Sequence, residues 1–414
     1  MLEKGINLIG YFDKAFGLGE TSRLFIKALQ ARSIPFALLS ADDLAPFHQS
    51  AFFQADLSKD FAFPVNLFCI DPHHIAPFIE KFPWKKVKHC YNIAVWFWET
   101  NLIPESMKDG WCYLDEMWVT SRYIQEHLSS HTSLPIHCLC HPLQRSASLD
   151  IPNKQRFNLP NKFTFLFFFD FYSVFARKNP LALIQAFQKA FPTQQDVQLV
   201  IKSQNGHQFP HQLEPMRELT RSDPRLIWID RSLESNERYA LMNACDCYIS
   251  LHRSEGFGLT MAEAMLLEKP VIATRYSGNL EFMSDQNSFL CSYQLTQIGP
   301  GHAPYPENGL WADVDINHAA HWMRYVASHP HEASQKAQQG KATILQNYSC
   351  EKVGQQIQAR LNAIYSHPVS KRMPVRFMKK KMKDAAYATL FFLRRSFWKS
   401  LINKMLPLPK PYKK

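Results

Sequence analysis

Residues 250–263, SLHRSEGFGLTMAE, decide the fold of this chain. The apolar segment at 247–252 predicts a buried strand, and the pattern at 259–267 predicts a helix. A glycine-containing turn lies between them, and such a turn at a helix N-terminus can bind an anion such as a diphosphate. It would present three backbone N–H groups to that ligand, those of Phe257, Gly258 and Leu259.

Two glutamates frame this turn. Glu255 comes directly before it, and Glu263 lies just over one turn inside the following helix. This spacing allows the two carboxylates to contact two parts of one ligand. Glutamate pairs are common on surface helices, so the pair becomes specific only with the EGFGL turn and the strand PVIAT that follows at 270–274.

The same order of strand, loop and helix recurs along the chain, which is typical of parallel α/β domains. In the first half, strands are predicted at 6–12, 65–70, 91–98, 116–121 and 136–140, and a helix at 21–32. After a polar stretch at 141–160, strands are predicted at 163–170, 197–202, 225–230, 247–252 and 270–274, with helices at 180–191, 236–243 and 259–267. We therefore expect two Rossmann-like, doubly wound α/β domains that face each other across a cleft, with ligands at the carboxyl ends of the strands.

The segment EGFGLTMAEAM at 255–265 resembles the E-x7-E motif of retaining family 4 glycosyltransferases. The resemblance extends over about 163–323, through FDFYSVFARKNPLALIQAF, LVIKSQNG, KPVIATRYSGNLEFM and GLWADVD, and points to bacterial enzymes of cell-surface polysaccharide assembly. It implies the GT-B fold. It also implies that Glu255 lies by the donor sugar and that Glu263 hydrogen-bonds the ribose of the nucleotide.

Cations for the diphosphate follow the 163–170 strand. Lys178 matches the family's diphosphate-binding lysine, and Arg177 beside it can supply a bidentate fork. Many family members carry an arginine several residues upstream, where this chain has Asp170 to Ser173. Lys202 and Arg177 are the candidates to replace it. The alternative for Arg177 and Lys178 is an exposed pair of residues that begins a helix.

Two further segments are candidates for donor contact through the resemblance. Gly17 and Gly19 are placed in a loop between a strand and a helix, where glycines allow a ligand to approach the backbone. A second loop follows the 270–274 strand at a position where the family closes over the donor. Its candidates are Ser277, Gly278 and Glu281, and the alternative for them is ordinary loop structure.

The acceptor side is assigned to the first domain, with Glu99 and Arg122 as candidates and core packing as the alternative for the region around Glu99. His252 could be a hydrogen-bonded residue at a strand end or could approach the donor. No metal is expected: the D-x-D at 313–315 lies outside the donor residues, and the His and Cys residues at 137–141 lack zinc-site spacing. The only co-substrate expected is a GDP- or UDP-sugar.

The basic residues are concentrated at the C-terminus. The net charge is +11, but residues 371–414 hold fourteen Lys and Arg with one acid, which leaves 33 basic and 35 acidic residues before them. A general nucleic-acid-binding surface is therefore disfavoured. Residues 377–406 predict an amphipathic helix that lies on an anionic membrane, and a solvated tail or one that binds nucleic acid nonspecifically is the alternative.

Three regions are predicted: an acceptor-side domain at 1–150, a nucleotide-sugar domain at 151–366 and a membrane-association tail at 367–414. The last helix of the second domain is expected to pack back on the first domain. Nine cysteines without framework spacing, and no signal peptide or spanning segment, predict a cytoplasmic protein at the inner membrane face. The function expected is a retaining transfer of a hexose, by likeness mannose, to a glycan or lipid-linked acceptor. A catalytically silent nucleotide-sugar-binding protein and a GT-B sugar-nucleotide epimerase are the alternatives.

Overall fold

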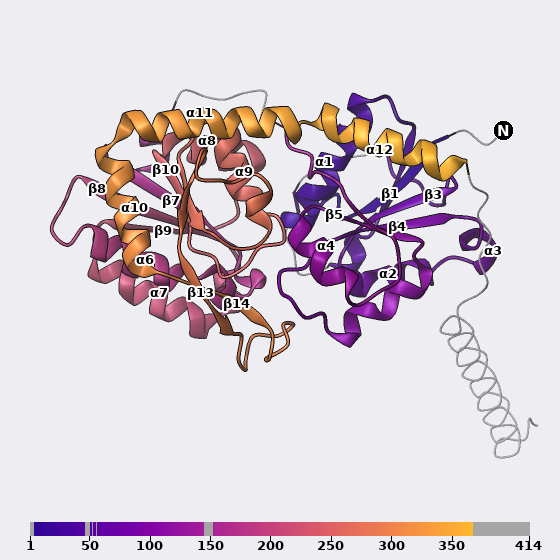
Figure 1. Cartoon of the computed structure of the whole chain (residues 1–414), viewed down its shortest axis with the longest axis horizontal. Coiled ribbons are helices and arrows are strands. Elements are labelled where there is room, and N and C mark those ends of the chain that lie inside the picture. Colours follow the sequence, from indigo (N-terminus) through magenta and orange to yellow (C-terminus); the bar gives the residue numbers. More distant parts are fainter. Residues whose placement is uncertain (1–3, 46–49, 52, 55, 145–151, 367–414) are drawn as a thin grey trace, which may run out of the picture.

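The computed structural model describes residues 4–45, 50–51, 53–54, 56–144 and 152–366. Two α/β lobes lie side by side, and two long helices at the end of the described chain run across both of them (Figure 1). These are α11 (Pro330–Asn347) and α12 (Cys350–Tyr365). The predicted tail at 377–406 lies outside the described residues.

The first lobe is built on a six-stranded sheet in the order β2-β1-β3-β4-β5-β6, in which every pairing is parallel. The strands are β1 (Ile6–Gly10), β2 (Phe36–Ser40), β3 (Val65–Cys69), β4 (Tyr91–Trp96), β5 (Glu116–Val119) and β6 (Ile136–Cys138). Its helices are α1 (Gly17–Ala31), α2 (Pro72–Ile79), α3 (Trp84–Val87) and α4 (Arg122–Ser129), with 3-10 turns η1 (Asp42–Leu44) and η2 (Glu105–Tyr113). The strands are nearly continuous apolar runs because helices cover both faces of such a sheet.

The second lobe repeats this plan with a parallel sheet in the order β12-β11-β10-β7-β8-β9. The strands are β7 (Phe163–Phe168), β8 (Val197–Ser203), β9 (Leu226–Asp230), β10 (Cys247–Ser250), β11 (Val271–Thr274) and β12 (Phe289–Cys291). The helices are α5 (Phe175–Lys178), α6 (Pro180–Ala190), α7 (Pro210–Ser222), α8 (Ser235–Ala244), α9 (Leu259–Leu266) and α10 (Ile316–Ser328). Short 3-10 turns are η3 (Gln155–Phe157), η4 (Phe171–Ser173), η5 (Gly206–Gln208) and η6 (Gly278–Glu281).

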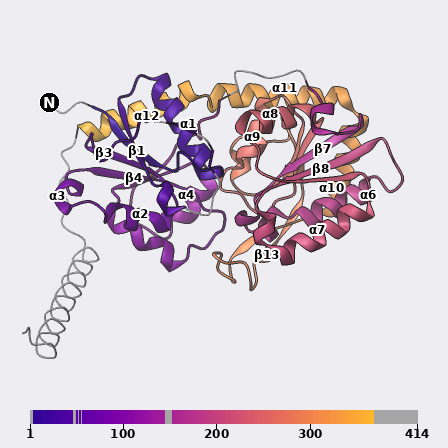
Figure 2. The same cartoon turned by 180° about the vertical axis from the view of Figure 1, so that it is seen from behind.

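Helix α12 packs on the first lobe although it follows the second in sequence (Figure 2). Its apolar face, Val353, Ile357, Leu361 and Ile364, shares a core with β1 and α1. At Gly354 an added Cβ would lie 2.4 Å from the carbonyl oxygen of Ala28, so the two helices approach this closely only because the residue is glycine. Arg360 adds a charged contact, its Nε lying 3.1 Å from the Glu116 carboxylate.

The sequence predicted ten of the fourteen described strands but only some of the helices. Each predicted strand and helix has its counterpart, while β2, β12, an antiparallel hairpin of β13 (Tyr293–Gln297) and β14 (Leu310–Val314), and helices such as α2, α4, α7 and α10 were not anticipated. Helix α1 begins at Gly17, so Gly17 and Gly19 form its first turn and not the predicted loop. No helix within the described ranges combines the length and apolar character that a bilayer-spanning helix requires.

Candidate active site

A cavity of about 830 Å³ lies between the two lobes. The first lobe contributes the start of α1 and the segments that follow β3 and β4, and the second contributes the segments that follow β7, β8, β9 and β10. These segments leave the carboxyl ends of parallel strands, which is where doubly wound sheets bind ligands. The two lobes thus supply opposite walls of one site.

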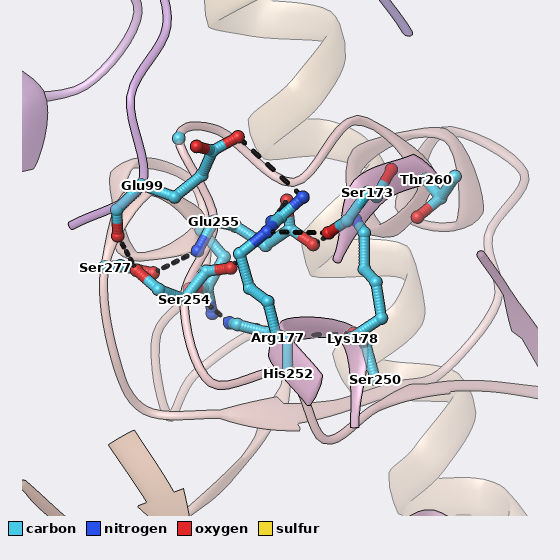
Figure 3. A network of polar contacts seen from close by, with 12 residues as sticks. Glu99, Ser173, Arg177, Lys178, Ser250, His252, Ser254, Glu255, Thr260 and Ser277 are labelled. Carbon is cyan, nitrogen blue, oxygen red and sulfur yellow. Dashed lines mark hydrogen bonds and ion pairs between the residues drawn. The ribbon is translucent and has the colours of Figure 1, made fainter. Parts of the chain in front are cut away.

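A cluster of three charged side chains lies on the wall of the second lobe (Figure 3). Arg177 Nη1 is 3.0 Å from Glu255 Oε2, and Lys178 Nζ donates to Glu255 Oε1. Burial alone would raise the pKa of Glu255, but the charges of Lys178 and Arg177 outweigh it and lower the pKa to about 2. Burial also lowers the pKa of Lys178, against the opposing effect of Glu255. The carboxylate is therefore ionised between two cations.

Local backbone conformation places the two cations. They end the one-turn helix α5, which is bracketed by residues with positive φ, Val174 at 60° and Asn179 at 57°. For a β-branched residue such as Val174 this region is strained, by about 1–3 kcal/mol. Because β7 and β10 are neighbours in the sheet, the segments after them meet, and Lys178 reaches Glu255.

The guanidinium group of Arg177 contacts protein acceptors through all three of its nitrogens. Its Nη1 donates to the carbonyl oxygen of Ser254 at 2.9 Å and its Nε to that of Ser173 at 3.1 Å, while Nη2 lies 3.8 Å from Glu99 Oε1 of the other lobe. Only 4% of the residue is exposed. The guanidinium therefore orients Glu255 and joins the lobes, which leaves Lys178 as the cation freer to meet a diphosphate.

The turn after β10 also faces the cavity, which is lined by Gly256, Phe257, Gly258 and Leu259. Gly258 has φ of +95°, a conformation that strongly favours glycine. Phe257 is buried, with its ring stacked at 5.0 Å on His141. Across the described ranges, the amides of Phe257 and Gly258 donate to no other group. The two amides therefore have no intramolecular acceptor among the described residues, and their binding of an anion stays a prediction.

The second glutamate of the motif, Glu263, is not among the residues that line the cavity, so the structure does not show the predicted donor contact. Glu263 is fully buried; its Oε1 accepts a hydrogen bond from the Tyr239 hydroxyl at 3.0 Å and lies 3.0 Å from Arg238 Nη2. Burial raises the pKa of Glu263, although Arg238 opposes this. Its Oε2 has no hydrogen-bond partner among the described residues. Arg238 itself lines the cavity and lies 3.5 Å from Glu20 of the first lobe.

Comparison with solved structures identifies the architecture. A glycosyltransferase from Rickettsia africae matches with a TM-score of 0.64 and 15% identity over 88% of this chain and 99% of its own. HepE from Anabaena, solved with UDP and glucose, matches with a TM-score of 0.60 and 15% identity over 87% of this chain and 100% of its own. Sucrose-phosphate synthase from Thermosynechococcus elongatus matches with a TM-score of 0.61 and 14% identity over 88% and 99%. The chain has the GT-B fold.

The family comparison concerns the second lobe. Residues 153–294 match the family model described as glycosyl transferases group 1. A search of curated protein sequences gives no match. The family match and the GT-B fold together support a group 1 glycosyltransferase. The predicted fold class is thereby confirmed for the two domains.

Within this GT-B cleft, Lys202 is a second candidate cation. It lies at the end of β8, lines the cavity and is 6% exposed. Burial and the charge of Arg238 lower its pKa to about 8. Among the described residues, no carboxylate lies within 4.0 Å of its Nζ, whose nearest polar contact is Gln204 Oε1 at 3.4 Å. It is therefore less constrained than Arg177.

The predicted donor contacts after β11 are displaced. Ser277 Oγ accepts a hydrogen bond from the Glu255 amide at 2.8 Å, and the Gly278 amide donates to the Glu255 carbonyl oxygen at 2.9 Å. Glu281 accepts from the Arg122 amide at 2.5 Å. The cavity lining does not include Ser277, Gly278, Glu281 or Arg122. The structure gives Ser277, Gly278 and Glu281 a supporting position behind the turn in place of the predicted direct contact, and it places the acceptor candidate Arg122 outside the cavity.

Of the first-lobe candidates Glu99, Gly17 and Gly19, two line the cavity and one does not. Glu99 and Gly17 line the cavity, and a Cβ added at Gly17 would meet open space. Gly19 does not line it. Its Cβ would lie 2.1 Å from the Lys14 carbonyl oxygen, so glycine is needed there for the loop to pack on α1 and not for ligand approach.

Other residues considered from the sequence have structural partners. His252 is buried, with Nδ1 3.1 Å from Ser250 Oγ and Nε2 3.2 Å from Asn279 Oδ1. Asp315 caps α10, and Asp313 lies 3.2 Å from Arg253. The described ranges contain no group of three or more His, Cys, Asp or Glu residues placed to hold a metal.

The sequence did not single out many of the cavity residues, among them Glu20, Arg238 and Tyr305, which make contacts between the lobes. Glu20 and Arg238 lie within amphipathic helices and look like ordinary surface charges in the sequence. Tyr305 belongs to the connection between β13 and β14, more than 40 residues from the motif. No local pattern marks any of them.

Proposed function

We propose that this protein is a retaining, nucleotide-sugar-dependent glycosyltransferase of the family 4 type. The observation that carries the proposal is the cluster of Lys178, Arg177 and Glu255 beside the open amides of Phe257 and Gly258, on one wall of an interlobe cavity. Anion-binding amides and a buried lysine suit a nucleoside diphosphate leaving group. HepE from Anabaena, with which this chain shares its fold, was solved in complex with UDP-glucose.

Donor binding would rearrange the charges of this cluster. A diphosphate that meets Lys178 replaces Glu255 as the partner of its ammonium group, and the freed carboxylate oxygen can accept a hydrogen bond from a sugar hydroxyl. Arg177 holds the other carboxylate oxygen throughout. The positive charge then stabilises the diphosphate as it departs in a poorly solvated site, where such stabilisation is strongest.

The ribose would be bound by Glu263. Its Oε2 is a buried acceptor without a partner among the described residues, which is costly unless a ligand satisfies it. A ribose hydroxyl is a donor of the required kind. Arg238, which lies 3.0 Å from Glu263, and Lys202 both line the cavity and would balance the remaining negative charge of the nucleotide.

The proposed chemistry is a same-face displacement. The bond between the anomeric carbon and the phosphate oxygen breaks, and the acceptor oxygen bonds to the same face of the oxocarbenium-like centre. The acceptor proton passes to the leaving phosphate oxygen. The protein contributes by positioning the reactants and by stabilising charge.

We propose a GDP- or UDP-hexose as donor, with mannose as the sugar, and a glycan or lipid-linked acceptor in cell-surface polysaccharide assembly. A nucleotide and a sugar derivative occur together in one solved structure of similar fold: a TarM mutant from S. aureus was solved with Fondaparinux, α-GlcNAc-glycerol and UDP. Residues 377–406, outside the described residues, would hold the enzyme at the inner face of an anionic membrane.

Calorimetric titration with GDP and UDP, followed by hydrolysis and transfer assays with GDP- and UDP-sugars, tests this function. We expect one nucleotide to bind at least about tenfold more tightly than the other, because the base is held in a shaped pocket. Slow release of the sugar from the matching donor is also expected. Binding without hydrolysis or transfer would indicate a silent binding protein, epimerised donor would indicate an epimerase, and uptake of neither nucleotide would exclude the enzyme.

A further inference from the structure

The β13–β14 hairpin joins the two lobes (Figures 1 and 2). It begins at the end of the segment that matches the family model, and three of its residues, Ile298, Tyr305 and Trp311, belong to the hydrophobic core of the first lobe. The Leu310 amide also donates to Asn101 Oδ1 of that lobe at 2.7 Å. The hairpin is therefore anchored in the lobe opposite to the one from which it emerges.

This anchoring brings Tyr305 to the cavity. Pro304 and Tyr305 line it, and the Tyr305 ring packs against Trp98 with centroids 5.2 Å apart. The Tyr305 hydroxyl donates a hydrogen bond of 3.0 Å to Glu99 Oε2. A residue of the second lobe's hairpin thus fixes a carboxylate of the first lobe.

Glu99 is held in place by hydrogen bonds, but one of its carboxylate oxygens accepts none from the described residues. Its carbonyl oxygen accepts hydrogen bonds from Ser254 and from Tyr123, the latter at 3.1 Å. Its Oε1 lies 3.8 Å from Arg177 Nη2, beyond hydrogen-bond distance, and no residue in the described ranges donates to it. The side chain is 22% exposed and lines the cavity. One carboxylate oxygen is thus available to a ligand.

Arg177 relates this carboxylate to the donor cluster. Its two terminal nitrogens face Glu255 of the second lobe and Glu99 of the first (Figure 3). If the donor sugar lies against Glu255, a ligand that hydrogen-bonds Glu99 Oε1 approaches from the other side of the same guanidinium. A carboxylate accepts hydrogen bonds from hydroxyls, and the rings of Trp98 and Tyr305 give an apolar wall, the mixture typical of small-ligand sites.

We propose that the β13–β14 hairpin completes an acceptor subsite for a pyranoside, in which Tyr305 is a positioning residue that holds Glu99 so that Oε1 accepts a hydrogen bond from the reacting hydroxyl. The inference rests on the proposed transferase function. It assigns acceptor recognition to a contact between the lobes, so both lobes are needed to form the subsite. The proton still leaves to the phosphate oxygen, and Glu99 only orients the hydroxyl.

The test uses the Tyr305→Phe variant of the full chain, with Tyr293→Phe as a matched control that removes a hydroxyl from the same hairpin outside the cavity lining. Octyl gluco-, galacto- and mannopyranosides are the acceptor probes, measured for transfer and for binding in the presence of the matching nucleoside diphosphate. We expect Tyr305→Phe to raise the KM for the octyl glycoside about tenfold, since it loses a hydrogen bond to a charged group. The nucleotide affinity of Tyr305→Phe should stay within twofold of that of the unmodified protein. The acceptor KM of Tyr293→Phe should also stay within twofold of the unmodified value.

A double-mutant cycle separates positioning from a general structural role. In the Glu99→Ala background, Tyr305→Phe should change the KM by less than about twofold, because its effect acts through Glu99. Equal acceptor KM in Tyr305→Phe and the unmodified protein would overturn the proposal, and so would nucleotide binding without uptake of any octyl glycoside. Failure to bind either nucleotide would instead contradict the proposed function.

Discussion

Two charge clusters of the same design lie at the cavity, but the pKa of the motif glutamate is lowered in one cluster and raised in the other. In each, an arginine of the second lobe lies between one glutamate of the E-x7-E motif and one glutamate of the first lobe. Arg177 joins Glu255 to Glu99, and Arg238 joins Glu263 to Glu20. Each motif glutamate therefore takes part in a charge contact between the lobes, in addition to the ligand role that we propose for it.

The difference lies in the number of cations around the motif glutamate. Glu255 has Arg177 and Lys178 and a pKa lowered to about 2, whereas Glu263 has Arg238 alone and a raised pKa. The first cluster can give up one cation to a diphosphate and remain paired. The second keeps an unsatisfied oxygen that suits a neutral hydroxyl. One motif thus supplies two chemically different contacts because its surroundings differ.

The sharpest test of this division is Lys178→Ala. If Lys178 stabilises the departing diphosphate, the transfer rate should fall by about 10²–10³, the usual cost of losing one transition-state charge contact. The affinity for the nucleoside diphosphate should change only a few-fold. Lys189→Ala, which removes an exposed lysine of α6, is the control and should behave like the unmodified enzyme. Equal losses in rate and affinity would contradict the proposed role.

A second test compares the stability contributions of the two glutamates. Glu255→Gln leaves Arg177 and Lys178 without their buried counter-charge, so the free energy of unfolding should fall by about 3–5 kcal/mol. Glu263→Gln should cost clearly less, because burial already disfavours its charged form. Denaturant unfolding of both variants at pH 7 measures the difference, and equal losses would remove the distinction between the clusters.

The pH dependence follows from the same pKa values. The folded-state pKa of Glu255 lies below its ordinary value of 4.5, so its stabilising effect is complete above that pH and is lost as the pH falls toward about 2. Glu263 has the opposite sign, since its raised pKa makes protonation on acidification favour the folded state. Glu255→Gln should therefore flatten the loss of stability between about pH 4.5 and 2. Glu263→Gln should act above about pH 4.5, where it removes the stability that the unmodified protein gains as the pH falls toward that value.

The smallest effect is expected for ribose recognition. A 2′-deoxy nucleoside diphosphate should bind the unmodified protein about tenfold more weakly than the ribonucleotide, because Glu263 loses a hydrogen-bond donor. In Glu263→Ala the two nucleotides should bind equally. Calorimetry with both ligands measures this, and discrimination that survives in Glu263→Ala would place the ribose contact elsewhere.

The fold class could be predicted from the sequence because the buried strands of a parallel sheet are continuous apolar runs, which are easy to recognise. VNLFC at β3 and FTFLFF at β7 are of this kind. Strand β2 and the β13–β14 hairpin were missed. Residues Tyr293–Gln297 are mostly exposed and polar, and nothing local distinguishes them from a loop. The two motif glutamates were identifiable because one strand, turn and helix holds both of them. Lys178 was identifiable because it follows a second such strand, β7, where it matches the family's lysine.

The amino-acid sequence by itself determined the two doubly wound lobes, the glycine turn at 256–259 before α9 and the cations that follow β7, because each depends on residues close together along the chain. Only the tertiary structure decided that Arg177 and Arg238 each bridge the lobes, that Ser277 and Gly278 support Glu255 from behind, and that Tyr305 reaches Glu99. These contacts join segments up to 218 positions apart, Glu20 and Arg238. They depend on how the two sheets meet, which no local pattern encodes.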